Sequence, residues 1–180
     1  MTSLYDVSIP VMTTVVNTLS NILKKGEQYV KEKNISEADL LDSRIYEDML
    51  PLASQVLVVV STIRKTIDKL TGSTLPPVQG LNGSNGETLA KLHQFMEQTL
   101  RDLSAVNRET VEGKGNTEVI FNVGPHMVKK ATLAEFIHGY TVPYIYFHLN
   151  IAYAILRQNG VPLGKLDYLD AFIHKYFQDA

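Results

Sequence analysis

The 180-residue sequence contains no cysteine. This absence excludes disulfide bonds, thiolate metal ligands and a cysteine nucleophile. An excess of charge of either sign is lacking too, because 17 Lys and Arg residues nearly balance 19 Asp and Glu residues, for a formal net charge of −2. A nearly neutral chain has no electrostatic signature of a nucleic-acid or anionic-membrane partner, so we expect neither.

Long apolar runs and a secretion signal are also missing. A membrane-spanning helix needs roughly 18 or more apolar residues, and a run such as Val56 to Val60 is far shorter. The first residues, MTSLYDVSIPVMTT, have neither the basic start nor the continuous apolar core of a signal peptide. We therefore expect a cytoplasmic protein. The phosphate-binding patterns GxGxxG and GxxxxGK[ST], the zinc pattern HExxH and the paired Glu-x-x-His of di-iron bundles do not occur either.

What is present suits one ordinary globular domain over residues 1–180. Hydrophobic residues make up 44% of the chain and charged residues 20%, which is a normal balance of core and surface. Apolar residues recur at helical spacing in four long segments, 4–33, 43–70, 87–106 and 133–159. The sequence therefore predicts four long helices.

Local signals predict where these helices end. Asn34, Gly72 and Gly160 are expected to terminate the first, second and fourth helices. Ser36 reads as the N-cap of a short helical turn. Pro51 lies inside the predicted second helix and is expected to kink it, because proline lacks a backbone donor and clashes with the preceding turn.

Two further segments complete the predicted fold. Apolar and polar residues alternate from 117 to 122, and Gly124 then breaks the run, which predicts a short β-hairpin. Thr132 and Glu135 have the spacing of a capping box that opens the fourth helix. Residues 164–180 are too apolar for a loose terminus and should form a short packed helix, whereas 73–86 reads as a loop. The predicted fold class is all-α, a four-helix bundle with a short hairpin before the last long helix and a C-terminal helical tail.

Polar side chains on the inward stripes of two helices are the first candidates for a site, because bundles build their sites from such residues. Arg44, Asp48 and Gln55 lie near one line of the second predicted helix, with Asp48 and Gln55 about 20° apart. The fourth helix presents the second set by the same count. Its members are Tyr140, Tyr144 and His148.

The functional interpretation is a pocket between the second and fourth helices. Asp48 would orient His148 as a general acid or base, and Tyr144 would donate a hydrogen bond to a ligand. Arg44, Gln55 and Tyr140 would bind and orient that ligand. The alternative is purely structural: a buried histidine with one partner is a common core device, and Arg44 and Asp48 form an ordinary surface pair at i, i+4.

Three segments carry a resemblance to a known superfamily. The runs LYDVSIPVMTTVVNTLSNIL, SRIYEDMLPLASQV and VPYIYFHLNIAYAILRQNGVPLGKLDYL resemble the first, second and last helices of DinB-like four-helix-bundle proteins. The resemblance is greatest to an uncharacterised, domain-of-unknown-function branch, and it covers roughly residues 4–170. It implies a bundle that often dimerises and has a pocket at the helix ends.

The resemblance also implies where a metal would sit. Many members bind a divalent metal through three histidines, one from the second helix and two from a His-x-x-x-His pair on the fourth. Here His148 matches the second histidine of the pair, the first falls on Tyr144, and the second-helix ligand falls near Asp48 or Met49. One imidazole and one carboxylate make a poor zinc or nickel site. We therefore expect no metal ligands, no bound transition metal and no cofactor.

Three functions stay open from the sequence. The first is a small-molecule-binding protein, with a metal-independent enzyme as its catalytic form and His148 as the acid or base. The second is a non-catalytic homodimeric binding or interaction module, suggested by the apolar tail. The third, a minor alternative, is a divalent-metal-dependent enzyme of the DinB-like kind.

Overall fold

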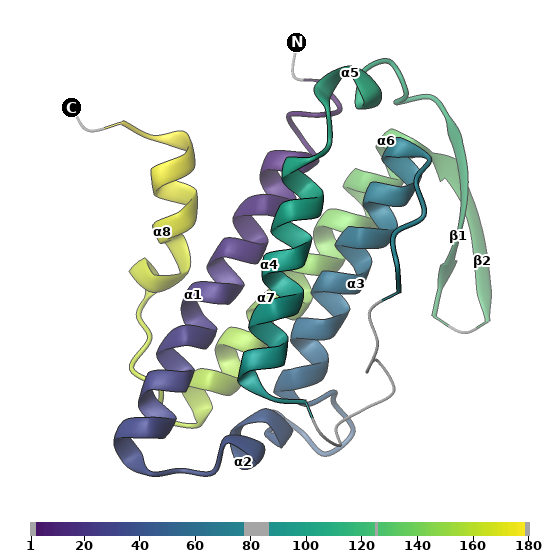
Figure 1. Ribbon diagram of the computed structural model, residues 1–180. Helices are drawn as coiled ribbons and strands as arrows, with labels where there is room; N and C mark the ends of the chain where they lie inside the picture. Colours follow the sequence, from purple (N-terminus) through teal and green to yellow (C-terminus); the bar gives the residue numbers. More distant parts are fainter. Residues whose placement is uncertain (1–2, 78–86, 125, 179–180) are drawn as a thin grey trace.

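The computed structural model describes residues 3–77, 87–124 and 126–178. The part of the predicted 73–86 loop from residue 78 to 86 lies outside these described residues. Four long helical segments lie side by side in an up-and-down bundle (Figure 1). They are α1 (Ile9–Lys33), α3 (Leu52–Thr71), α4 (Leu89–Ser104) and a last segment that ends in α7 (Val142–Gln158). No helix of the described residues is long and apolar enough to cross a membrane.

The four segments enclose one apolar core. Helices α1 and α3 each contact both α4 and α7, which places α1 and α3 at opposite corners of the bundle. The side chains between them are almost fully buried, and Met12, Leu19, Ile63, Leu92 and Leu149 are at most 1% exposed. Burial of this kind contributes roughly 1.5–3 kcal/mol for each large apolar side chain.

The predicted helix ends are confirmed at three positions. Asn34 takes the left-handed conformation (φ 52°) after α1, Gly72 does so (φ 79°) after α3, and Gly160 (φ 87°) follows α7. Ser36 caps the short helix α2 (Glu37–Asp42) by accepting a hydrogen bond from the backbone N–H of Asp39. These positions hold because capping is a local backbone requirement, independent of packing.

The predicted start of the second helix is wrong. Residues 43–51 are not helical, and α3 begins only at Leu52, with Pro51 as its N-cap. Proline disfavours helical geometry in the residue before it, so the helix starts after Pro51 instead of bending around it. The backbone N–H of Leu52 donates to the carbonyl oxygen of Ser43 (2.9 Å) and closes the segment as a loop.

A two-stranded antiparallel hairpin precedes the last helix, as predicted. Strand β1 (Glu118–Val123) pairs with β2 (Met127–Thr132), with Phe121 opposite Lys129. The hairpin lies beside α3 at one edge of the bundle, and a short helix, α5 (Arg108–Val111), links it to α4 (Figure 1). It therefore places β1 next to a helix face that the bundle leaves uncovered.

The last helical segment contains an unusual turn. The Thr132–Glu135 capping box opens α6 (Leu133–Phe136), as predicted, and a π-helical turn, η1 (Ile137–Thr141), then joins it to α7. A π turn inserts one extra residue and is frequent at functional sites. It carries Tyr140.

The apolar tail forms the predicted helix, α8 (Lys165–Tyr176), which packs on α1 and α7 (Figure 1). Its outer side leaves Leu166 70% exposed, and Phe177, just beyond it, is 70% exposed.

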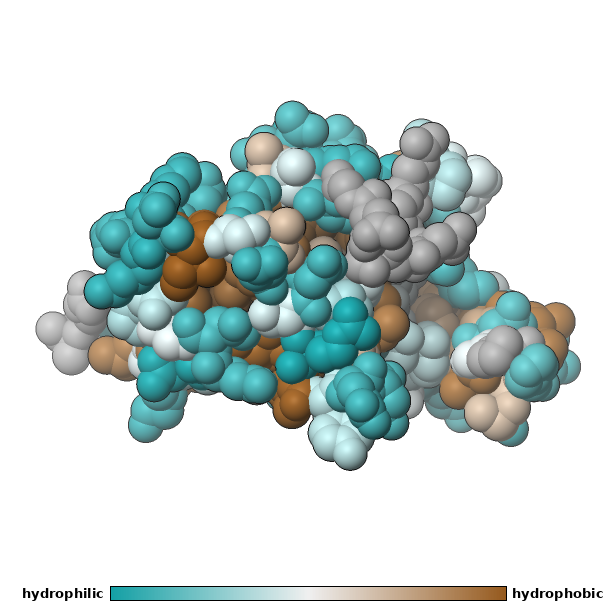
Figure 2. Space-filling view, turned by 90° about the horizontal axis from the view of Figure 1, so that it is seen from below, coloured by the Kyte–Doolittle hydropathy of each residue, from teal (hydrophilic) through white to brown (hydrophobic). Residues whose placement is uncertain are grey.

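The end of the bundle at α2 shows mostly hydrophilic side chains, with separate apolar patches and no continuous apolar face (Figure 2). The homodimer stays a prediction.

Candidate functional site

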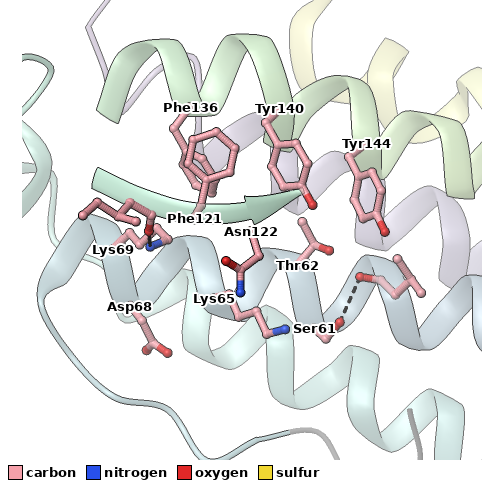
Figure 3. Close-up of a pocket in the computed structure, with 12 residues that line it drawn as sticks. Ser61, Thr62, Lys65, Asp68, Lys69, Phe121, Asn122, Phe136, Tyr140 and Tyr144 are labelled. Atoms are coloured by element: carbon pink, nitrogen blue, oxygen red, sulfur yellow. Dashed lines mark hydrogen bonds between the residues drawn. The ribbon is translucent and has the colours of Figure 1, made fainter. Parts of the chain in front are cut away.

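A cleft of about 610 Å³ lies between α3, β1 and the segment that runs from α6 through η1 into α7 (Figure 3). We refer to it as the aromatic cleft. Its volume falls in the range of small-molecule sites in proteins, roughly 300–1,000 Å³. The residues that line it are Val58, Ser61, Thr62, Lys65, Asp68, Lys69, Ile120, Phe121, Asn122, Phe136, Tyr140 and Tyr144.

Helix α3 supplies the polar floor of the aromatic cleft. Val58, Thr62, Lys65 and Lys69 recur at three- and four-residue spacing, so they share one face of the helix. The rest of α3 is almost entirely buried in the bundle. The charged side chains of Lys65, Asp68 and Lys69 line the cleft, whereas that of Arg64, also on α3, is buried.

Aromatic rings form the opposite wall. The rings of Tyr140 and Tyr144 are nearly parallel, with centroids 5.1 Å apart, and the centroids of Phe136 and Tyr140 are 5.7 Å apart. Phe121 of β1 contacts both Phe136 (4.7 Å) and Tyr140 (5.2 Å). Centroid distances of 4.5–7 Å are favourable for aromatic pairs. The hairpin is thus attached to the helix by rings that also line the cleft.

The two tyrosine hydroxyls point across the cleft toward α3, on the side of Thr62 (Figure 3). Burial, with the neighbouring Tyr144 as a second cause, raises the pKa of Tyr140 above its ordinary value. Its phenol therefore keeps its proton at neutral pH and can donate. The hydroxyls of Tyr140, Tyr144 and Thr62 make no hydrogen bond to any described residue, so three polar groups of the cleft have capacity for a ligand.

Two of the three charged side chains at the cleft already have partners. Lys69 donates from Nζ to the carbonyl oxygen of Ile120 (2.9 Å), and this hydrogen bond ties β1 to α3. Its Nζ also lies 5.6 Å from the ring centroid of Phe136. Asp68 accepts at Oδ1 from the backbone N–H of Leu75 (2.8 Å) and holds the segment after α3. Lys65 is exposed and, among the described residues, makes no ion pair or hydrogen bond.

A buried polar pair lies behind Tyr144. Nδ1 of His148 and Oε1 of Gln55 are 2.6 Å apart, and the two residues are only 5% and 2% exposed. Gln55 donates from Nε2 to the carbonyl oxygen of Leu50 (2.7 Å), which fixes its amide with Oε1 toward the histidine. Oε1 can only accept, so Nδ1 carries the hydrogen and Nε2 keeps its lone pair.

Burial sets the charge of this pair and its neighbour. Loss of water contact lowers the pKa of His148 to about 4, so the imidazole is neutral at pH 7. The ring of Tyr144 meets that of His148 edge to face, with centroids 4.6 Å apart. Since Gln55 and His148 are themselves fixed by hydrogen bonds, Tyr144 is held against a rigid support.

Four of the six predicted site residues lie in or directly behind the cleft. Tyr140 and Tyr144 line the aromatic cleft, and Gln55 and His148 form the pair directly behind it. The expected stripe of Tyr140, Tyr144 and His148 is confirmed by the contacts between successive rings.

Arg44 and Asp48 are placed elsewhere. Both side chains are exposed in the 43–51 loop, and Arg44 makes only a long contact of 3.5 Å to the carbonyl oxygen of Met49. The expectation that Asp48 shares an enclosed space with His148 is wrong, because the helix that would have turned Asp48 inward begins four residues later. Gln55 takes the place that Asp48 was expected to fill beside the imidazole.

Sequence reasoning missed Thr62 and Lys65 on α3 and Phe121 on β1. Thr62 continues the line of Gln55 by about two turns, so extending that stripe would have found it, whereas Lys65 lies about 80° from that line. Phe121 carried a weaker signal, its inward place in the alternating strand pattern. Nothing in the sequence indicates which helix the hairpin covers.

The residues at the expected metal position do not fit a transition metal. Tyr144 stands beside His148 where the resemblance would place the first histidine of the pair. The expected second-helix position, near Asp48 or Met49, lies in the 43–51 loop, and Gln55 is the α3 residue beside the imidazole. An amide oxygen, a phenol and a single imidazole are a poor donor set for zinc or nickel. Over residues 3–77, 87–124 and 126–178, no three His, Cys, Asp or Glu side chains are grouped so that they could hold a metal ion.

Fold and site together define a DinB-like four-helix bundle with a hairpin-covered aromatic cleft. The structure is similar to a crystal structure of a DinB family member protein from Shewanella denitrificans, with a TM-score of 0.79 and 30% sequence identity over 92% of this chain and 91% of that chain. Residues 4–169 match the family model described as "Domain of unknown function (DUF1993)". The chain belongs to this DUF1993 family. No curated protein matches it.

Proposed function

We propose that this protein binds a small organic molecule in the aromatic cleft without the help of a metal ion. The observation that carries the proposal is the convergence of three hydroxyls on one cavity of about 610 Å³. They belong to Thr62, Tyr140 and Tyr144 and have no hydrogen-bond partner among the described residues. Ligand sites combine an apolar wall with a few converging polar groups, and the cleft has both.

Binding requires a wall that keeps its geometry when the ligand arrives. The hydrogen-bonded Gln55–His148 pair supports Tyr144 in this way, because both side chains are held by hydrogen bonds. A preorganised wall loses less conformational entropy on binding. In this proposal His148 is a positioning residue for Tyr144, and it does not contact the ligand.

No reaction is assigned to the cleft. General acid-base catalysis is most efficient for a group whose pKa lies near the operating pH, and the pKa of His148, about 4, lies well below neutral pH. Asp48, the expected partner of the imidazole, is exposed on the 43–51 loop. The proposal is therefore a binding protein, and the acid-base role first expected of His148 and Asp48 is not part of it.

A screen of a fragment library by thermal shift and ligand-observed NMR tests the proposal. We expect fragments that raise the melting temperature of the wild-type protein by mass action. For fragments that accept a hydrogen bond, Tyr144→Phe should weaken binding about 2–10-fold, because it removes one hydroxyl and keeps the ring.

Tyr176→Phe is the matched control, since Tyr176 lies on α8 and is 52% exposed. It should leave every affinity unchanged. The proposal fails if no fragment binds the folded wild-type protein, or if the hits bind Tyr144→Phe and Tyr176→Phe equally well.

A further inference from the structure

The aromatic cleft has three parts of different chemistry, and each recognises a different feature of a ligand. One wall is aromatic, the floor carries hydroxyls, and the mouth carries charge. Each part restricts the class of molecule that fits.

The wall favours an aromatic ring. Tyr140 and Tyr144 are stacked with an interplanar angle of 16°, and both extend edge-on toward α3, with their hydroxyls leading (Figure 3). Aromatic side chains favour a further ring beside them in an offset-stacked or edge-to-face arrangement. Phe121 and Phe136 extend the same apolar wall toward the hairpin.

The charge at the mouth favours an anion. Lys69 is bound to the carbonyl oxygen of Ile120, and Asp68 is engaged by Leu75 and by the hydroxyl of Ser73 (3.1 Å). Lys65 is the lining charge without a partner among the described residues, and its ammonium lies between Asn122 and Ser61 (Figure 3). The uncommitted charge of the cleft is therefore positive.

The hydroxyls suit the same ligand. Thr62 stands one turn before Lys65 on α3, and the phenols of Tyr140 and Tyr144 face it from the other wall. The lining thus contains hydroxyl donors and an ammonium group, and a carboxylate, which only accepts hydrogen bonds, can use both. A cationic ligand would instead meet the two ammonium groups of Lys65 and Lys69 against the single carboxylate of Asp68.

We infer that the ligand of the aromatic cleft is an aromatic carboxylic acid, with its ring against Tyr140 and Tyr144 and its carboxylate at the ammonium of Lys65. The inference rests on the proposed function and adds the substrate class to it. Lys65 supplies the selectivity for charge, and the rings supply the selectivity for planar molecules.

Three naphthalene compounds of nearly equal shape test the inference: 2-naphthoate, 2-naphthylmethanol and 2-naphthylmethylamine. Their affinities are measured by NMR shift titration of the ¹⁵N-labelled full chain at pH 7 and constant ionic strength. We expect 2-naphthoate to bind about 10-fold or more tightly than the neutral alcohol, because a charge-assisted hydrogen bond adds to the ring contact. The amine should bind most weakly of the three.

Substitutions of the lysine assign the effect to one side chain. Lys65→Met should lower the affinity for 2-naphthoate about 10-fold and leave that for the alcohol unchanged, whereas Lys65→Arg should retain most of the affinity for the acid. Lys33→Met removes an exposed lysine at the end of α1, far along the chain from the cleft residues, and should change nothing.

The outcomes separate this inference from the proposed function. Equal affinities for acid and alcohol, or a Lys65→Met protein that still prefers the acid, overturn the inference and leave a cleft that binds neutral molecules. Failure of all three naphthalenes to bind also overturns it. The proposed function falls only if the wider fragment screen finds no ligand at the cleft.

Discussion

Between pH 7 and pH 4, the wild-type protein should lose about 3 kcal/mol more of its free energy of unfolding than a His148→Gln variant. The folded-state pKa of His148 is about 4, and the ordinary value of 6.5 applies to the unfolded chain. Between these values the unfolded chain takes up a proton that the folded protein does not. The stability is therefore fully present above about pH 6.5 and is lost as the pH falls toward 4.

Urea unfolding followed by circular dichroism at several pH values measures this difference. The variant removes the imidazole and keeps a polar group opposite Gln55, and the carboxylates that titrate in the same range are common to both proteins. Their contribution therefore cancels in the comparison. Parallel pH profiles for the two proteins would contradict the buried neutral state of His148 on which the support of Tyr144 depends.

Breaking the ion pair between Arg64 and Asp102 should lower the free energy of unfolding by about 3–5 kcal/mol. Arg64 Nη1 and Asp102 Oδ2 are 3.2 Å apart, and both side chains are only 10% exposed. Asp102→Leu leaves the guanidinium buried, with the carbonyl oxygen of Pro76 (3.0 Å) as its remaining partner. An uncompensated buried charge is costly because it has lost water without gaining an opposite charge.

A double-mutant cycle separates the pair from its parts. The Arg64→Met/Asp102→Leu protein should be much more stable than the sum of the two single losses predicts, because neither charge is then left alone. Glu118→Gln is the matched control, since it breaks an ion pair to Lys130 on the hairpin whose side chains are 58% and 65% exposed. It should cost less than about 1 kcal/mol. Additive losses in the cycle would show that the buried pair is not coupled.

This pair matters for the cleft because it fixes α3 on α4. Arg64 is adjacent in sequence to Lys65, so the two side chains leave the helix in different directions. One holds α3 in the bundle, and the other lines the aromatic cleft. The position of the cleft floor thus depends on a contact outside it.

Local chemistry explains which parts of the fold the sequence predicts. Asn34, Gly72, Gly160 and the Thr132–Glu135 capping box mark element ends through their own backbone and side-chain bonds, and all are confirmed. The predicted second helix extends through Pro51 because its apolar stripe does, and this prediction is wrong. The restriction that proline places on the preceding residue outweighed that periodicity, and Asp48 became a loop residue.

Tertiary placement explains what the sequence does not predict about the site. Tyr140, Tyr144 and His148 follow one helical line, so their association is visible in the sequence. The contact of His148 with Gln55 depends on the exact start of α3, which was wrong by nine residues (43 against 52). The part played by Phe121 depends on where the hairpin docks, and hairpin docking is a long-range contact that local patterns do not encode.

The central claim is that the cleft between α3, β1 and the η1–α7 segment holds a small molecule. Chemical-shift mapping of the labelled protein with the tightest fragment from the screen tests it most directly. We predict saturable shifts concentrated at Thr62, Lys65, Phe121, Tyr140 and Tyr144. Shifts concentrated instead on the 43–51 loop or on α8, with the cleft residues unmoved, would contradict it.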